Sequence, residues 1–168
     1  MNTFNDQIPF IYLKPSEIHI TKTPSMVETV LGSCVSVTMF DRTSGVSMIC
    51  HCLLPKCKNE NHCNGDCSDG FKYVDCSIRR MIAKYAAYDI KRSNIEVKVF
   101  GGADMFKTSA ESANSIAIGK QNIETALKII KAERLNLIAS DVGGTRGRKI
   151  FFNTYTGEVH LKRLNKAG

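Results

Sequence analysis

The sequence predicts an α/β (α+β) sandwich in which mixed β-sheets are flanked by two main helices. Short runs rich in β-branched residues precede, separate and follow two stretches whose apolar residues recur at steps of three and four. The resulting order β-β-β-β-α-β-α-β-β-β favours a three-layer arrangement. The chain has 168 residues, the size of one domain, so we expect a single domain over residues 1–168.

The N-terminal half is predicted to be all strand. We expect strands at residues 17–20, 27–31, 35–40 and 46–52. The sequence Asp-Arg-Thr-Ser-Gly between the last two is typical of a turn. Strands 35–40 and 46–52 therefore form a predicted hairpin.

The rest of the chain alternates helices with strands. The first helix begins at Tyr73, with the apolar residues Val74, Ile78, Met81, Ile82 and Tyr85 on one side. The second begins near Gly119, with the apolar residues Ile123, Ala126, Leu127 and Ile130. Further strands are expected at residues 95–100, 137–142, 149–153 and 159–164.

Composition narrows the class of protein. The 43% hydrophobic and 23% charged residues exclude collagen-like, coiled-coil and disordered chains. No apolar run approaches the roughly 18 residues of a membrane span, and the first residues do not resemble a secretion signal, so we expect a cytoplasmic protein with no direct membrane insertion. The net charge of +7 favours acidic partners.

The sharpest local feature is a cysteine at the start of a strand, in Leu-Gly-Ser-Cys-Val at residues 31–35. Gly32 lets a substrate approach closely, and a turn through Ser33 and Cys34 can direct successive N–H groups at one point. Such a turn can form an oxyanion hole. The alternative is that Cys34 is a small buried apolar residue, the usual environment of cysteine.

His51 is the natural partner for Cys34, because the predicted hairpin brings it back beside the cysteine. If Phe40 faces Gly45 across a four-residue loop, Cys34 lies opposite His51. A five-residue loop would place Cys34 opposite Cys52 instead. The alternative for His51 is a hydrogen-bonded histidine with a structural role.

The pair is chemically reasonable. A free thiol is only partly ionised at neutral pH, and an adjacent imidazole is expected to raise the thiolate fraction and then to protonate a departing amine. Thr29 or Ser33 could orient the imidazole. The remaining histidines, His19, His62 and His160, are expected on the surface or in loops.

A cysteine-rich insertion loop is predicted at residues 56–70. Cys57, Cys63 and Cys67 lie in it together with His62. Their spacing departs from the usual zinc-binding pairs, so zinc, free thiols and redox-active thiols are all left open. A zinc site would need a further ligand, from among Cys50, Cys52 and Cys76.

The glycine-rich stretches at residues 100–105 and 141–149 match no nucleotide-binding fingerprint. Arg146, Arg148 and Lys149 could attract an acidic partner, but a solvated loop is the favoured interpretation. The chain has no recognised nucleic-acid motif, so no nucleic-acid partner is expected.

Seven motifs together resemble the CheD family of chemoreceptor glutamine deamidases. They occur in the family's order, and the resemblance covers about residues 10 to 165, nearly the whole chain. The motifs are Thr29-Val-Leu-Gly-Ser-Cys-Val35, His51-Cys-Leu-Leu-Pro55, Tyr73-Val-Asp75, Phe100-Gly-Gly-Ala-Asp-Met105, Ile118-Gly-Lys-Gln-Asn122, Asp141-Val-Gly-Gly144 and Thr156-Gly157.

The resemblance implies the fold of deamidating-toxin-type cysteine hydrolases. It also implies that Cys34 is the nucleophile, His51 the base and Thr29 the third catalytic residue, with no metal or cofactor. Some family members carry the threonine one residue upstream, where this chain has Glu28.

The resemblance further implies a substrate. This is a glutamine side chain on the cytoplasmic helices of a methyl-accepting chemotaxis receptor, hydrolysed to glutamate with release of ammonia through a thioester. The alternative is a non-catalytic regulatory module that docks a CheC-type phosphatase.

Overall fold

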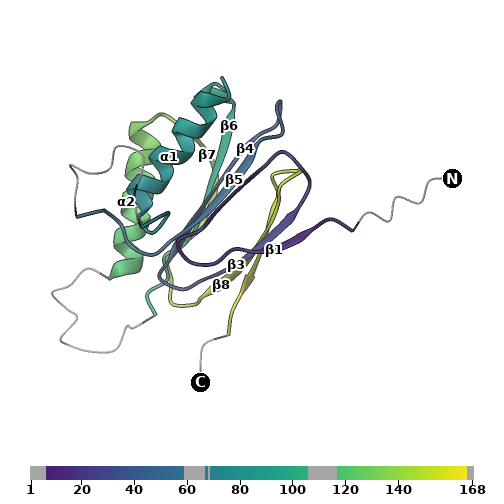
Figure 1. The fold of residues 1–168 in the computed structure, drawn as a ribbon. Coiled ribbons are helices and arrows are strands. Elements are labelled where there is room, and N and C mark those ends of the chain that lie inside the picture. Colours follow the sequence, from purple (N-terminus) through teal and green to yellow (C-terminus); the bar gives the residue numbers. More distant parts are fainter. Residues whose placement is uncertain (1–6, 59–66, 68, 106–116, 166–168) are drawn as a thin grey trace, which may run out of the picture.

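The computed structural model describes residues 7–58, 67, 69–105 and 117–165 and confirms the predicted sandwich. Two helices cover one face of a five-stranded sheet, and a four-stranded sheet packs against its other face (Figure 1). In chain order the elements are β1 (Phe10–Tyr12), β2 (Ile18–Thr21), β3 (Met26–Leu31), β4 (Val35–Asp41), β5 (Ser47–Cys52), α1 (Val74–Ala87), the short helix η2 (Arg92–Asn94), β6 (Ile95–Gly101), α2 (Ile118–Ala132), β7 (Asn136–Val142), β8 (Arg148–Asn153) and β9 (Val159–Arg163).

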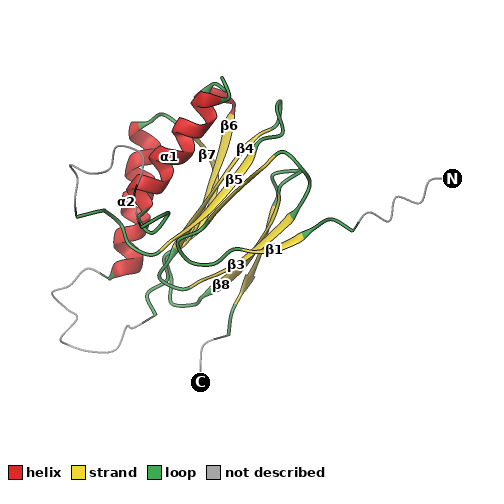
Figure 2. Cartoon of the chain, viewed as in Figure 1, coloured by secondary structure: helices red, strands yellow, loops and turns green. Residues whose placement is uncertain are grey.

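Both sheets are mixed, as predicted. The four-stranded sheet has the order β1-β3-β8-β9, and the five-stranded sheet has the order β2-β5-β4-β6-β7 (Figure 2). The pairs β1–β3 and β6–β7 are parallel, and the other neighbours are antiparallel. The strand β1 is absent from the sequence prediction, because three residues are too few to show a pattern.

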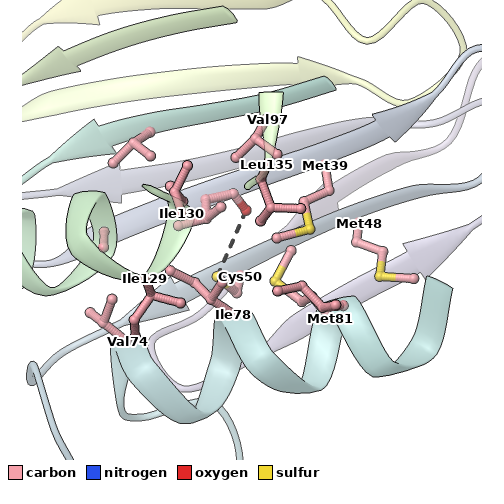
Figure 3. Packing of buried hydrophobic residues seen from close by; sticks show 14 of the residues in the cluster. Met39, Met48, Cys50, Val74, Ile78, Met81, Val97, Ile129, Ile130 and Leu135 are labelled. Carbon is pink, nitrogen blue, oxygen red and sulfur yellow. Dashed lines mark hydrogen bonds between the residues drawn. The ribbon is translucent and has the colours of Figure 1, made fainter. Parts of the chain in front are cut away.

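Two apolar clusters lie on opposite faces of the five-stranded sheet. The helix-side core, between this sheet and the helices, includes Val37, Met39, Cys50, Ile78, Met81 and Tyr85 (Figure 3). The inter-sheet core consists of Leu13, Val27, Leu31, Ile49, Phe100, Ile150 and Phe152. Every residue of β4 and β5 is buried, so alternate side chains on these strands enter different cores.

Cys50 and Cys52 point into the helix-side core, where both are completely buried. They pack there as apolar core side chains. Within the described residues no group of three His, Cys, Asp or Glu side chains is placed to hold a metal. Cys63 and His62 of the predicted insertion lie outside the described residues.

Arg148 is buried, so the expectation of a solvated side chain is wrong for this residue. The residue is 1% exposed. It donates to the Asp141 carboxylate at 2.7 Å, to the Gly101 carbonyl at 2.8 Å and to the Gly143 carbonyl at 2.6 Å. One side chain therefore ties the end of β6 to the glycine turn after β7.

The neighbouring cations also have partners. Lys149 pairs with Glu28 at 2.9 Å, and Arg146 donates to the Leu164 carbonyl at 2.9 Å. None of the helices in the described part of the chain is long and apolar enough to span a membrane.

We expect Arg148→Ala to lower the free energy of unfolding by about 3 kcal/mol, because it leaves buried acceptors without their donor. Arg163→Ala is the matched control. Arg163 contacts the other oxygen of the same Asp141 carboxylate at 2.6 Å from a more exposed position, so its loss should cost less than about 1 kcal/mol. Urea denaturation measures both, and equal losses would contradict the assignment.

Candidate functional site

Thr29 and His51 meet between the two sheets. Thr29 shares the buried face of β3 with Val27 and Leu31, and His51 lies beside Ile49 on the inter-sheet face of β5. Thr29 Oγ1 lies 2.7 Å from His51 Nδ1. A hydrogen bond thus joins the four-stranded sheet to the five-stranded sheet.

The partners of Thr29 determine which imidazole nitrogen carries the proton. Thr29 Oγ1 also lies 2.8 Å from the carbonyl oxygen of Leu13, which can only accept. The single hydroxyl proton therefore goes to Leu13, and Oγ1 accepts from the Nδ1–H of His51. In the neutral imidazole this leaves a lone pair on Nε2, which is the arrangement that a general base requires.

Burial keeps this imidazole neutral. His51 is 3% exposed, and its removal from water lowers its pKa from 6.5 to about 4. The unfolded chain takes up the proton near pH 6.5, so the contribution of this residue to stability is lost as the pH falls from 6.5 towards 4.

The register of the hairpin differs from both predicted registers. Val35 pairs with Cys52, and Ser36 pairs with His51. Cys34 therefore lies opposite neither His51 nor Cys52 in the ladder.

The difference arises in the turn. The Asp41 N–H donates to the Val46 carbonyl at 3.0 Å, so the loop spans residues 42–45 and not 41–44. The Asp41 carboxylate accepts from two N–H groups of the turn at 3.3 and 3.1 Å, which stabilises this arrangement. Gly45 has a φ of 76°, a conformation that favours glycine.

Cys34 nevertheless lies on the same side of the sheet as His51. Val35 belongs to the helix-side core, whereas Cys34 packs against the inter-sheet core. Since Ser36 faces His51, Cys34 is the diagonal neighbour of His51, a position at which Cβ atoms are roughly 7 Å apart. The thiol is half-buried, so it is not sealed in the interior.

The thiol is not pre-ionised. Burial raises the pKa of Cys34, and the backbone N–H of the same residue acts in the opposite direction. The expected rise in thiolate fraction is therefore not what the structure shows. At neutral pH the site therefore contains a neutral thiol and a neutral imidazole.

The backbone around Cys34 is held by the glycine-rich end of β6. Ala103 N–H donates to the Gly32 carbonyl at 2.9 Å, and Gly102 N–H donates to the Cys34 carbonyl at 2.8 Å. A Cβ atom on Gly101 would lie 2.2 Å from the Cys34 carbonyl oxygen, so only glycine allows this approach.

Asn122 is the residue of the site that sequence reasoning missed. Its side-chain Nδ2 donates to the Ser33 carbonyl at 2.9 Å and to the Leu53 carbonyl at 3.0 Å. The only signal was its place in the motif at residues 118–122, which gave no indication of a contact with Ser33.

Two surface hollows lie beside the helices and away from this cluster. Their volumes are about 460 and 690 Å³, and both include Lys56 and Lys128. Neither is lined by Thr29, Cys34 or His51, which lie towards the other face of the five-stranded sheet.

The protonation state of His51 can be measured directly. We expect its ring signals in NMR spectra to stay constant between pH 7.5 and pH 5.5 and to move only near pH 4, because the buried ring resists protonation. The His51→Gln variant assigns the signals, and the urea-unfolded chain serves as the control that titrates near pH 6.5. A midpoint above pH 6 in the folded protein would contradict the neutral pair.

Three relatives match this chain over most of its length. A probable chemoreceptor glutamine deamidase CheD 2 from Geobacter sulfurreducens is 46% identical over 99% of this chain and 97% of its own. Probable chemoreceptor glutamine deamidases CheD from Maridesulfovibrio salexigens and Methanococcus maripaludis are each 33% identical, over 93% and 89% of this chain and 92% of their own lengths.

Solved structures are much less similar to this chain than these relatives are. The crystal structure of the hypothetical protein YfiH from Bacillus licheniformis has a TM-score of 0.41 and 10% identity, over 67% of this chain and 46% of YfiH. The family described as CheD chemotactic sensory transduction, in contrast, matches residues 53–163 directly. Together with the 46% identity to the Geobacter relative, this match shows that the chain belongs to the CheD family.

Proposed function

We propose that this chain hydrolyses the side-chain amides of glutamines to glutamate on methyl-accepting chemotaxis receptors in the cytoplasm. The hydrogen bond from His51 Nδ1 to Thr29 Oγ1 carries the proposal, because it leaves Nε2 free to accept a proton on the side of the sheet where Cys34 lies. The names of the relatives, chemoreceptor glutamine deamidases, supply the substrate class.

The first half of the reaction forms a thioester. The Cys34 thiol proton passes to His51 Nε2 while the sulfur attacks the amide carbon, because neither group is ionised beforehand. The carbonyl π electrons move to the oxygen and form an oxyanion. His51 Nε2–H then protonates the amide nitrogen, the carbon–nitrogen bond breaks, and ammonia leaves.

The second half of the reaction restores the enzyme. Water gives a proton to His51 Nε2 and attacks the thioester carbon. The carbon–sulfur bond then breaks, and the proton returns from His51 to Cys34. The product is a glutamate side chain, and no cofactor or redox partner is required.

The oxyanion is assigned to the backbone N–H groups of Ser33 and Cys34. In a trans peptide the N–H points away from the C=O, and the described residues contain no cis peptide bond. The Gly32 and Ser33 carbonyls are held by Ala103 and Asn122, so the N–H groups of the same two peptides are directed away from these donors. No backbone carbonyl in the described part of the chain accepts from either N–H.

Charge suits the proposed substrate. The chain has a net charge of +7, which favours association with acidic, glutamate-rich receptor helices. Lys56, Arg79, Arg80 and Lys128 line one of the hollows beside the helices, with Asp75 as its acidic residue. A positive surface of this kind can steer an acidic helix towards the enzyme, mainly by raising the association rate.

Removal of the nucleophile tests the reaction. We expect the wild-type chain to convert receptor glutamines to glutamates, as shown by peptide mass spectrometry of receptor fragments, and Cys34→Ala to abolish the conversion. Cys76→Ala, which removes a cysteine outside the inter-sheet core, is the matched control and should retain activity. Deamidation by Cys34→Ala would end the covalent mechanism.

A docking module for a CheC-type phosphatase is the alternative function. It predicts that the wild-type chain deamidates no receptor fragment, while Cys34→Ala and the wild type bind the phosphatase equally well.

The orienting role of Thr29 is tested with two variants. Thr29→Val has nearly the same shape but cannot accept from His51 Nδ1, so we expect kcat to fall by about 10- to 100-fold as the imidazole loses its orientation. Thr29→Ser keeps the hydroxyl and should retain most of the activity. Wild-type kcat in Thr29→Val would rule out this role.

A further inference from the structure

Asn122 occupies an unusual position in the first turns of α2. It is completely buried, and both atoms that its Nδ2 contacts, at 2.9 and 3.0 Å, are carbonyl oxygens. The orientation of the side-chain amide follows from these contacts, because the opposite orientation would place oxygen against two oxygens.

From these contacts we infer that Asn122 is a positioning residue for the oxyanion site of the proposed deamidation. Ser33 C=O and Cys34 N–H belong to one peptide group, which is planar. The hydrogen bond from Asn122 to the Ser33 carbonyl therefore restricts rotation of that peptide and sets the direction of the Cys34 N–H. Asn122 itself does not touch the substrate.

The second hydrogen bond of Asn122 fixes the position of its side-chain amide. Leu53 directly follows the last residue of β5, and His51 lies two residues before it. By holding the Ser33 and Leu53 carbonyls at once, Asn122 links the segment that carries the nucleophile to the segment that carries the imidazole. The imidazole of His51 is oriented separately, by its hydrogen bond to Thr29.

The helix that carries Asn122 packs against Gly102 and Ala103, the residues that hold the backbone around Cys34. A Cβ atom on Gly119 would lie 2.6 Å from the carbonyl oxygens of both Gly102 and Ala103, so α2 starts in direct contact with the chain that holds Cys34. Asn122 is therefore supported from two directions, by the packing of its helix and by its own hydrogen bonds.

Stability alone does not explain an asparagine here. Asn122 Oδ1 is buried and has no hydrogen-bond partner among the described residues. An unpaired buried acceptor costs roughly 1 to 3 kcal/mol. An asparagine is present in spite of this cost, which supports a role in the reaction for its two donor contacts.

The test distinguishes an effect of Asn122 on the oxyanion site from an effect on the reactivity of the Cys34 thiol. We compare the wild type with Asn122→Asp, which has the same shape but presents oxygen to both carbonyls. Two rates are measured: kcat and KM for ammonia release from a receptor fragment, and the rate at which iodoacetamide alkylates Cys34, followed by mass spectrometry of the Cys34 peptide. Alkylation needs the thiol and no oxyanion stabilisation.

We expect Asn122→Asp to lower kcat by roughly 10- to 100-fold, because a misdirected Cys34 N–H loses part of its stabilisation of the oxyanion. KM and the alkylation rate should change little. Lys120→Ala, an exposed change in the same helical turn, is the control and should behave as the wild type. Thr29→Val, which acts on the base, should slow both rates.

Each other outcome overturns the inference. Unchanged kcat in Asn122→Asp shows that the contact has no role, and a parallel loss of alkylation shows that Asn122 supports the thiol and not the oxyanion site. If Asn122→Asp does not fold, Asn122→Ala removes the donors without adding a charge and is judged by the same two rates. The inference rests on the proposed function, so a wild type that releases no ammonia defeats both, whereas an active wild type with an equally active variant defeats the inference alone.

Discussion

The hydrogen bond between Thr29 and His51 is the contact on which the site depends, because its two residues come from different sheets. Neither sheet alone contains both the imidazole and the group that orients it. The packing of the inter-sheet core therefore sets the geometry of the chemistry, and a shift of one sheet against the other would break the bond. The same burial that makes the bond strong also removes water from the ring and lowers the pKa of His51 to about 4.

A histidine with such a low pKa is a weak base. The proposed reaction makes use of the strong acidity of its protonated form. The imidazolium formed when His51 takes the thiol proton is a strong acid, since its pKa of about 4 lies well below that of a departing amine. It therefore gives the proton readily to the amide nitrogen, which must be protonated before ammonia can leave. The site favours breakdown of the tetrahedral intermediate over easy ionisation of Cys34, whose pKa is raised by burial.

Local patterns were sufficient to predict the main strands and helices, but the contacts between them were less predictable. The hairpin register depended on whether Asp41 paired with Val46, a choice made by the side-chain hydrogen bonds of the turn. Sequence reasoning could propose Thr29 or Ser33 as the partner of His51, yet only the packing of two sheets selects Thr29. The buried state of Arg148 depends in the same way on a carboxylate and two carbonyls that two separate segments, the end of β6 and the end of β7 with its turn, bring together.

The glycine-rich motifs share one role, which is to allow other segments to pack around the backbone of residues 32–34. Gly101 and Gly102 allow the end of β6 to approach Cys34 within hydrogen-bond distance, and Gly119 allows α2 to pack against that same segment. A Cβ atom on Gly101 would collide with the Cys34 carbonyl, and a Cβ atom on Gly102 or Gly119 would collide where the end of β6 meets α2. These glycines, which match no nucleotide-binding fingerprint, allow three protein donors to reach the successive carbonyls of Gly32, Ser33 and Cys34. The proposed oxyanion site lies on the opposite edges of those peptides.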